Sequence, residues 1–164
     1  MILYIVRHAW AEYHGDPRWT DDTQRPLTDK GKDRFAKVVE LLSDRNFLPR
    51  VVATSPYVRC CETAQIIAQV CPSRPDVVTL DDLAPVGDFG GLLNWTASRF
   101  STFDQVAWVG HAPDVGHLAA ALIGNDQAWI RFAKGAVAAI EFNNSVDLGQ
   151  GELRWLTTAK TLGC

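Results

Sequence analysis

Long hydrophobic runs are absent from this sequence of 164 residues. Its uninterrupted apolar stretches fall far short of the about 20 residues that a membrane-spanning helix needs, and residues 1–6 lack the basic leader and small-residue cleavage site of a signal peptide. The four cysteines form no CxxC pair, and the adjacent Cys60 and Cys61 cannot easily bridge each other. We therefore expect a protein of the reducing cytoplasm, with no membrane partner and no disulfide framework.

A strong excess of charge of one sign is also missing. There are 16 lysines and arginines against 19 aspartates and glutamates, for a net charge of -3, so nucleic acid is not an expected partner and any anion site must be local. Hydrophobic residues make up 47% of the chain, and a chain of this length can bury about 70% of its unfolded surface. No linker, repeat or low-complexity tract interrupts it, which predicts a single domain over residues 1–164.

Several familiar catalytic motifs are absent as well. There is no GxxxxGK(S/T) loop for nucleotide phosphates, and no HExxH helix or paired CxxC motif for zinc. No cysteine has an arginine six residues later, and no DxDx(T/V) sequence follows an apolar strand. We therefore expect neither a cofactor nor a metal.

Strands and helices alternate along the chain. Apolar periodicity predicts helices over residues 29–45, 56–71, 90–100 and 113–123, the first of them capped by Thr28. It predicts strands over residues 1–6, 50–54, 77–80, 105–109, 136–142 and 152–156. This order predicts an α/β fold, a three-layer α/β/α sandwich around a mainly parallel sheet with an antiparallel edge at the C-terminal end.

Cationic side chains follow three of the predicted strands. Arg7 and His8 come after the first strand, Ser55 and Arg59 after the second, and His111 after the fourth. In such a sheet, ligands bind beyond the carboxyl ends of the strands. Although each residue alone has an ordinary structural explanation, together they predict a phosphate pocket.

The residue types in this pocket favour phosphoryl transfer. A neutral imidazole can attack phosphorus directly, so His8 is the preferred nucleophile. The forked donors of Arg7 and Arg59 match phosphoryl oxygens, and they would repel a metal cation. His111 would add another donor if it were protonated. Among six tryptophans, Trp10 is the one best placed to line the cleft, although packing is the usual role of such a residue.

Five motifs, RHAWAE, RPLTDKG, SPYVRCCETA, LAPVGD and GHAP, occur in the order found in the histidine phosphatase superfamily, and the chain resembles its small SixA-type phosphohistidine phosphatase branch. The resemblance implies a phosphoglycerate mutase-like fold and a pocket formed by Arg7, His8, Arg59 and His111, in which His8 becomes phosphorylated. It also implies that Arg25 belongs to the pocket or supports it. A surface arginine that fixes the following turn is the alternative.

The sequence departs from the family pattern at two points. Ala112 replaces the asparagine of the related GHNP motif, so any support from that amide is missing. No acidic proton donor is evident either, because Asp81, Asp82 and Glu62 are candidates that are more simply explained as exposed carboxylates.

A missing acid bears on the substrate. An imidazole with a pKa near 6.5 leaves phosphorus far more easily than an alkoxide does, so phosphohistidine fits this site. The sequence therefore predicts a phosphohistidine phosphatase with a phosphorylated protein as its partner, a signalling histidine phosphotransfer domain being one candidate. A phosphatase of small phosphate esters or sugar phosphates, and a non-catalytic module that binds phosphoproteins, remain the alternatives.

Overall fold

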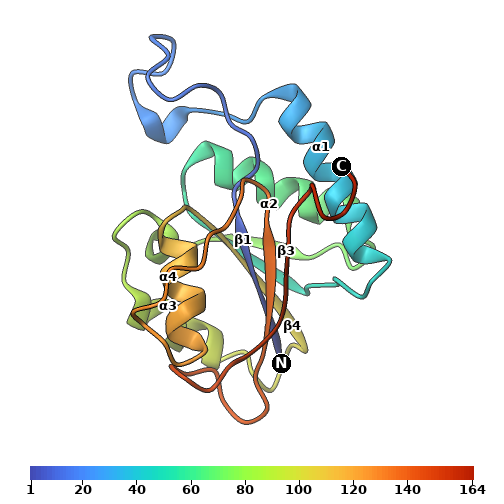
Figure 1. Ribbon diagram of the computed structural model, residues 1–164, viewed down its shortest axis with the longest axis vertical. Coiled ribbons are helices and arrows are strands. Elements are labelled where there is room, and N and C mark those ends of the chain that lie inside the picture. The colour runs from blue at the N-terminus through green and yellow to red at the C-terminus, as the bar shows by residue number, and fades with distance from the viewer.

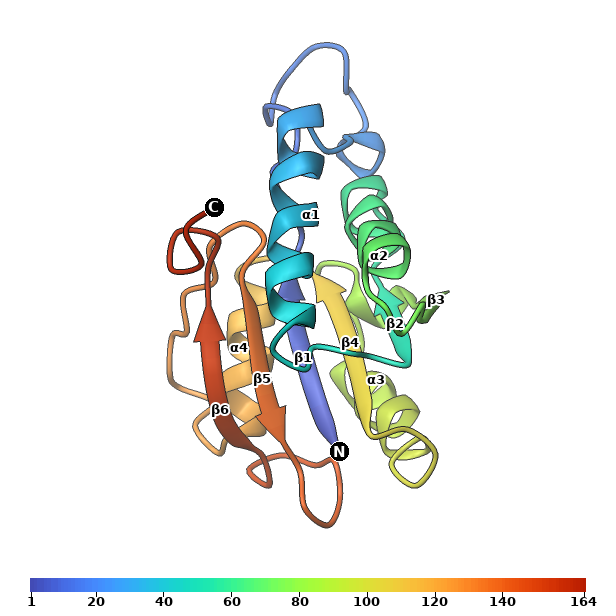
Figure 2. The same cartoon turned by 90° about the vertical axis from the view of Figure 1, so that its right-hand side faces the viewer.

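The computed structural model describes residues 1–164, and six strands form its single mixed sheet. The strands are β1 (Ile2–Arg7), β2 (Val51–Thr54), β3 (Asp76–Thr79), β4 (Gln105–Gly110), β5 (Val137–Glu141) and β6 (Glu152–Thr157). Their order in the sheet is β3-β2-β4-β1-β5-β6 (Figure 2). The pairs among β1, β2, β3 and β4 are parallel, whereas β5 pairs antiparallel with both β1 and β6. The predicted parallel sheet with an antiparallel edge is confirmed.

Two helices cover each face of the sheet, which completes the predicted three layers (Figures 1 and 2). The helices α1 (Asp29–Ser43) and α2 (Val58–Val70) lie on one face, and α3 (Phe89–Ala97) and α4 (Asp114–Leu122) lie on the other. Alternate residues of β1 explain this arrangement, because Tyr4 and Val6 enter the core under α1 and α2 while Leu3 and Ile5 enter the core under α3 and α4. A strand that is apolar on both faces requires cover on both.

The longest helix, α1, shows how local sequence sets an element. The Thr28 side chain accepts a hydrogen bond from the backbone N–H of Gly31 at 3.0 Å and so caps the helix. Phe35, Val38 and Leu42 recur at helical spacing and are buried. A Cβ atom at Gly31 would collide with the backbone carbonyl of Trp10, so only glycine lets the segment after β1 cross the start of α1 this closely.

The predicted element boundaries agree with the structure to within two residues for most elements. Helix α2 begins at Val58 rather than at 56, and α3 ends at Ala97 rather than at 100. Two short 3-10 helices, Asp22–Gln24 and Asp81–Leu83, lie in segments where no element was predicted. No helix is both long and apolar enough to cross a bilayer.

Candidate active site

Three adjacent strands end at the upper edge of the sheet in Figure 1. Arg7 at the end of β1 lies beside Gly110 at the end of β4, and Thr54 at the end of β2 lies beside Val109. The segments that follow these strands therefore leave the sheet side by side. A pocket of about 700 Å³ opens there, and the charged and imidazole groups that line it include Arg7, His8, Arg25, Arg59, His111 and Lys134. We call it the phosphate pocket.

The imidazole of His8 is held in one tautomer. Its Nδ1 atom lies 2.8 Å from the carbonyl oxygen of Ala9. Because a carbonyl can only accept, Nδ1 carries the proton and Nε2 keeps a free lone pair. The backbone N–H of Ala9 donates to Thr63 Oγ1 at 3.1 Å. This hydrogen bond ties Ala9, whose carbonyl holds the His8 ring, to α2.

His8 is also kept neutral. The residue is only 6% exposed, and burial, reinforced by the positive charges of Arg59 and Arg7, lowers the pKa of His8 to about 3 in spite of the hydrogen bond to Ala9. A neutral ring with an unprotonated Nε2 is the nucleophilic form.

The second buried imidazole, His111, is neutral as well. Its Nε2 lies 2.8 Å from Ser55 Oγ, and its Nδ1 lies 3.3 Å from an Nη of Arg59. Because a guanidinium only donates, Nδ1 is the acceptor and Nε2 carries the proton that binds Ser55. Burial and then the charge of Arg59 lower the pKa of His111 to about 4. The ring centroid lies 5.5 Å from that of His8.

The two flanking guanidinium groups have donors to spare. Arg7 donates from Nη1 to the carbonyl of Phe132 at 2.8 Å. Arg59 donates to the carbonyl of Asp22 at 2.7 Å. The Nε atoms of both arginines are buried and have no hydrogen-bond partner. Since both groups line the pocket, an oxyanion bound between them would be the natural acceptor.

Asp22 serves as the counter-ion of this cluster. Its carboxylate lies 3.0 Å from Arg59 Nη2, 2.8 Å from Arg25 Nε and 3.0 Å from His14 Nδ1. Partial burial raises the pKa of Asp22, but the hydrogen bonds from Arg25 and His14 and the charge of Arg59 bring it down to about 2. Asp22 does not itself line the pocket. It holds the side chains of Arg25 and Arg59 without entering the pocket.

Two residues predicted to bind substrate lie elsewhere. Trp10 does not line the pocket, because its ring packs at the edge of the core with the Arg34 guanidinium 4.3 Å from the ring centroid. Ser55 is fully buried and does not line the pocket either. Its hydroxyl instead holds His111, so its role in the structure is to orient a pocket residue.

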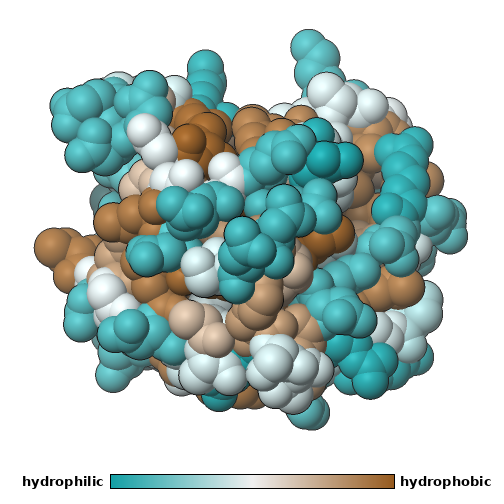
Figure 3. Space-filling view, turned by 90° about the horizontal axis from the view of Figure 1, so that it is seen from below, coloured by the Kyte–Doolittle hydropathy of each residue, from teal (hydrophilic) through white to brown (hydrophobic).

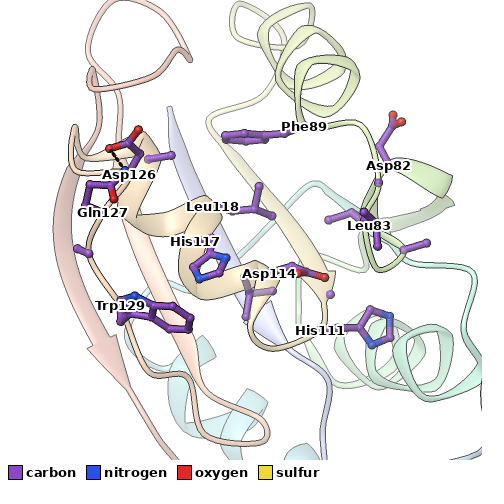
Figure 4. Close-up of a pocket in the computed structure, with 17 residues that line it drawn as sticks. Asp82, Leu83, Phe89, His111, Asp114, His117, Leu118, Asp126, Gln127 and Trp129 are labelled. Carbon is purple, nitrogen blue, oxygen red and sulfur yellow. Dashed lines mark hydrogen bonds between the residues drawn. The ribbon is translucent and has the colours of Figure 1, made fainter.

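The three carboxylates considered as proton donors also lie outside the phosphate pocket. Glu62 accepts hydrogen bonds from the backbone N–H of Leu27 and from Lys32 Nζ, both at 2.6 Å. Asp82 lines a neighbouring pocket, where its carboxylate is turned away from His111 (Figure 4). Asp81 lines neither pocket.

Three charged residues of the pocket, Glu12, Asp114 and Lys134, were not among the predicted site residues. Lys134 lines it from the loop before β5, and burial together with the charges of Arg7 and Arg25 lowers its pKa. Asp114 lines it from the first turn of α4, and burial raises the pKa of its carboxyl. Asp114 directly follows the GHAP motif, which is the one signal that pointed to it.

No group of three or more histidine, cysteine, aspartate or glutamate side chains is arranged to hold a metal ion. The four basic residues of the lining outnumber its two acidic ones, so the pocket is electropositive in a protein whose net charge is negative. Arginine-rich, half-enclosed pockets of this kind suit oxyanions.

Known proteins share this architecture. The model of the histidine phosphatase superfamily (branch 1) matches residues 3–117. An uncharacterized protein of Picosynechococcus sp. is 34% identical over 123 residues, which make up 74% of this chain and 73% of that protein. The phosphohistidine phosphatase SixA of Escherichia coli K12 is 25% identical over 156 residues, 94% of this chain and 92% of SixA. A structure of the protein histidine phosphatase SixA complexed with tungstate has a TM-score of 0.85 at 24% identity and covers 99% of each chain.

The chain belongs to the histidine phosphatase superfamily. The resemblance to its SixA-type branch, predicted from the motifs, is confirmed. The protein is accordingly a hydrolase, a phosphatase that works through a histidine nucleophile.

Proposed function

We propose that this phosphatase removes phosphate from a phosphorylated histidine of a partner protein, with His8 as its nucleophile and without a metal. The observation that carries the proposal is the state of His8, a neutral imidazole whose Nε2 lone pair is free and whose ring lines an electropositive pocket. Arg7, Arg59 and Arg25 bind the phosphoryl oxygens, and their charge stabilises the transition state. A histidine phosphotransfer domain is one partner of this chemistry.

Two displacements at phosphorus complete the reaction. In the first, Nε2 of His8 attacks, the new N–P bond forms, and the bond to the substrate imidazole breaks; that imidazole keeps the electron pair and takes a proton from solvent. In the second, water attacks phosphorus, the His8–phosphorus bond breaks, and the proton lost by water goes to solvent. The Nδ1 proton stays on the hydrogen bond to Ala9, so the phosphorylated ring is cationic and leaves readily.

His111 gains a second function once phosphate is bound. Its pKa is lowered by burial and by Arg59, and a phosphoryl dianion in the pocket offsets that positive charge. The proton that it then binds on Nδ1 turns an acceptor into a donor to phosphate, while Nε2 continues to donate to Ser55. Ser55 thus aims the ring in both states.

Phosphohistidine as substrate makes little demand on a proton donor. Glu62, Asp81 and Asp82 lie outside the phosphate pocket, and an imidazole leaving group with a pKa near 6.5 needs no strong acid. We also place the enzyme in the cytoplasm, whose reducing conditions suit its four free cysteines.

One observation favours a second candidate function, the hydrolysis of small phosphate esters. Asp114 lines the phosphate pocket, and burial raises the pKa of its carboxyl. A protonated carboxyl there would supply the acid that an alkoxide leaving group requires. This candidate keeps His8 as nucleophile and differs only in the leaving group.

Trapping of the phosphorylated enzyme tests the nucleophile. Rapid quenching after mixing with a phosphotransfer domain labelled on histidine with ³²P is expected to leave acid-labile label on the wild type and none on His8→Ala. The control, Lys160→Ala, changes an exposed residue that lines neither this pocket nor its neighbour, and it retains the label. Binding of the phosphoprotein without any labelling would instead show a non-catalytic module.

Comparison of leaving groups tests the substrate. For a phosphohistidine phosphatase, kcat/KM for the phosphorylated domain exceeds that for alkyl phosphate monoesters by orders of magnitude, and Asp114→Asn changes it less than about twofold, well inside the 10²-fold range of general acid catalysis. For a monoesterase, the order of substrates is reversed, and Asp114→Asn lowers alkyl ester turnover by about 10²-fold or more.

A further inference from the structure

A second pocket adjoins the phosphate pocket and has the opposite character. It has a volume of about 470 Å³ and lies between the 3-10 helix Asp81–Leu83, α3 and α4 (Figure 4). Most of its wall is apolar, from residues that include Leu83, Phe89, Leu118 and Ala121. The two pockets share Val86, His111 and Asp114, so they form one continuous surface. We call the second pocket the apolar groove.

Charge keeps phosphate out of the apolar groove. Its charged lining residues are Asp82, Asp114 and Asp126, and no lysine or arginine is among them. The phosphate pocket next to it has four basic residues. A phosphorylated ligand that spans both is therefore oriented, with its phosphate at His8 and an uncharged part in the groove.

Exposed hydrophobic side chains gather around this continuous surface. Six large hydrophobic residues of the protein are exposed, and three of them line the two pockets: Tyr13, Val86 and Trp129. Trp129 is 80% exposed and Val86 is 99% exposed. On the face that Figure 3 shows from below, apolar residues are interspersed with polar ones. Apolar groups exposed beside a cleft mark a surface that a partner covers.

The two rim residues, Val86 and Trp129, differ in their local structure. Val86 has a φ of 65°, a left-handed conformation that is rare and strained for a β-branched residue. Trp129 packs edge-to-face on His117 with ring centroids 4.8 Å apart. The chain next to Trp129 is pressed onto α4, since a Cβ atom at Gly116 would collide with the carbonyl of Ile130. The groove is therefore formed before any ligand arrives.

We propose that the apolar groove receives a bulky apolar side chain, leucine or phenylalanine, that the phosphorylated partner protein carries close to its phosphohistidine. The proposal rests on the proposed function and adds the feature by which the partner is recognised. A free phosphate or small phosphohistidine compound fills only the phosphate pocket. A protein surface also covers Trp129 and Val86, which no part of the phosphoryl chemistry uses.

Phosphohistidine peptides of nine residues test the proposal. Their central phosphohistidine lies in a glycine–serine background, and one leucine is moved through the four positions on either side. Burial of a leucine side chain lowers KM by about 10- to 100-fold at the matching position or positions. Free N-phosphohistidine serves as the reference for the chemical step.

Two variants of the enzyme test whether the lower KM of the leucine peptide depends on the groove. Ala121→Phe fills the groove from α4, and Trp129→Ala removes an exposed rim side chain without touching the core. Both are expected to abolish most of the advantage of the leucine peptide over the all-serine peptide. The control, Leu156→Ala, removes an exposed leucine of β6 and preserves the advantage.

The possible results distinguish a failure of the proposed function from a failure of this inference alone. If the wild type does not hydrolyse any phosphohistidine peptide or phosphorylated domain, the proposed function is wrong and this inference falls with it. If the wild type hydrolyses them but leucine gives no gain at any position, or the gain survives in both groove variants, only the inference is overturned.

Discussion

Acidification from pH 7 to pH 5 should destabilise this protein through its two buried imidazoles. His8 and His111 have pKa values lowered to about 3 and about 4, chiefly by burial, whereas a histidine of the unfolded chain has a pKa near 6.5. As the pH falls through 6.5, the unfolded state binds protons that the folded state does not, so the free energy of unfolding decreases. Each histidine contributes a loss of about 2 kcal/mol between pH 7 and pH 5, and the two together about 4 kcal/mol.

The carboxylate of Asp22 does not mask this loss. Asp22, whose pKa is brought down to about 2 by Arg25, His14 and Arg59 against the effect of burial, stabilises the folded state above its unfolded pKa near 3.9. Its contribution is lost only as the pH falls through that value toward 2, below the range considered. Between pH 7 and pH 5 Asp22 therefore adds little to the loss that the two imidazoles cause.

Urea unfolding at the two pH values measures the effect. The wild type should lose about 4 kcal/mol in its free energy of unfolding, and His8→Gln and His111→Gln should each remove about half of that loss. His117→Gln is the matched control, because His117 lies exposed on the surface. A wild-type loss below about 1 kcal/mol, or an equal effect of the control substitution, would refute the claim that both rings are buried in the neutral form.

Three further substitutions test the supports of the site. Asp22→Asn removes the counter-ion of Arg59, and we expect KM for a phosphorylated substrate to rise about tenfold in steady-state assays, the value of one charge-assisted hydrogen bond; an unchanged KM would refute that role. Ser55→Ala frees His111 from its orienting hydroxyl and should lower kcat about tenfold in single-turnover measurements, more than it raises KM. Trp10→Ala should lower Tm by several degrees and leave KM unchanged, which a cleft-lining role would not allow.

Much of the fold followed from simple patterns. Buried strands such as β1 and β4 are apolar on both faces, and α1 has both an apolar stripe and the Thr28 cap. The rule that ligands meet the carboxyl ends of parallel strands then placed His8 and His111 at one edge. Periodicity carried no information on the short 3-10 helix at Asp22–Gln24, because three residues are too few for an apolar pattern to repeat.

Sequence reasoning could not determine the contacts of side chains whose partners lie far away in the sequence. Glu62 lies one helical turn from Arg59, yet its carboxylate binds Lys32 across the contact between α1 and α2. Asp22 reaches Arg59 only because a long loop folds back over the start of α2. Trp10 follows the nucleophile by two residues, and the close passage at Gly31 draws its ring to α1 and Arg34. Such choices depend on loop paths, which local sequence does not determine.

The position of β1 in the sheet determines how the enzyme loses activity in denaturant. The strand that carries Arg7 lies between β4 and β5, with two further strands beyond β4 and one beyond β5. Edge strands such as β3 and β6 can fray while the interior backbone hydrogen bonds stay closed. Denaturant should therefore abolish activity and global secondary structure in one coincident transition, with no inactive but folded species accumulating before it.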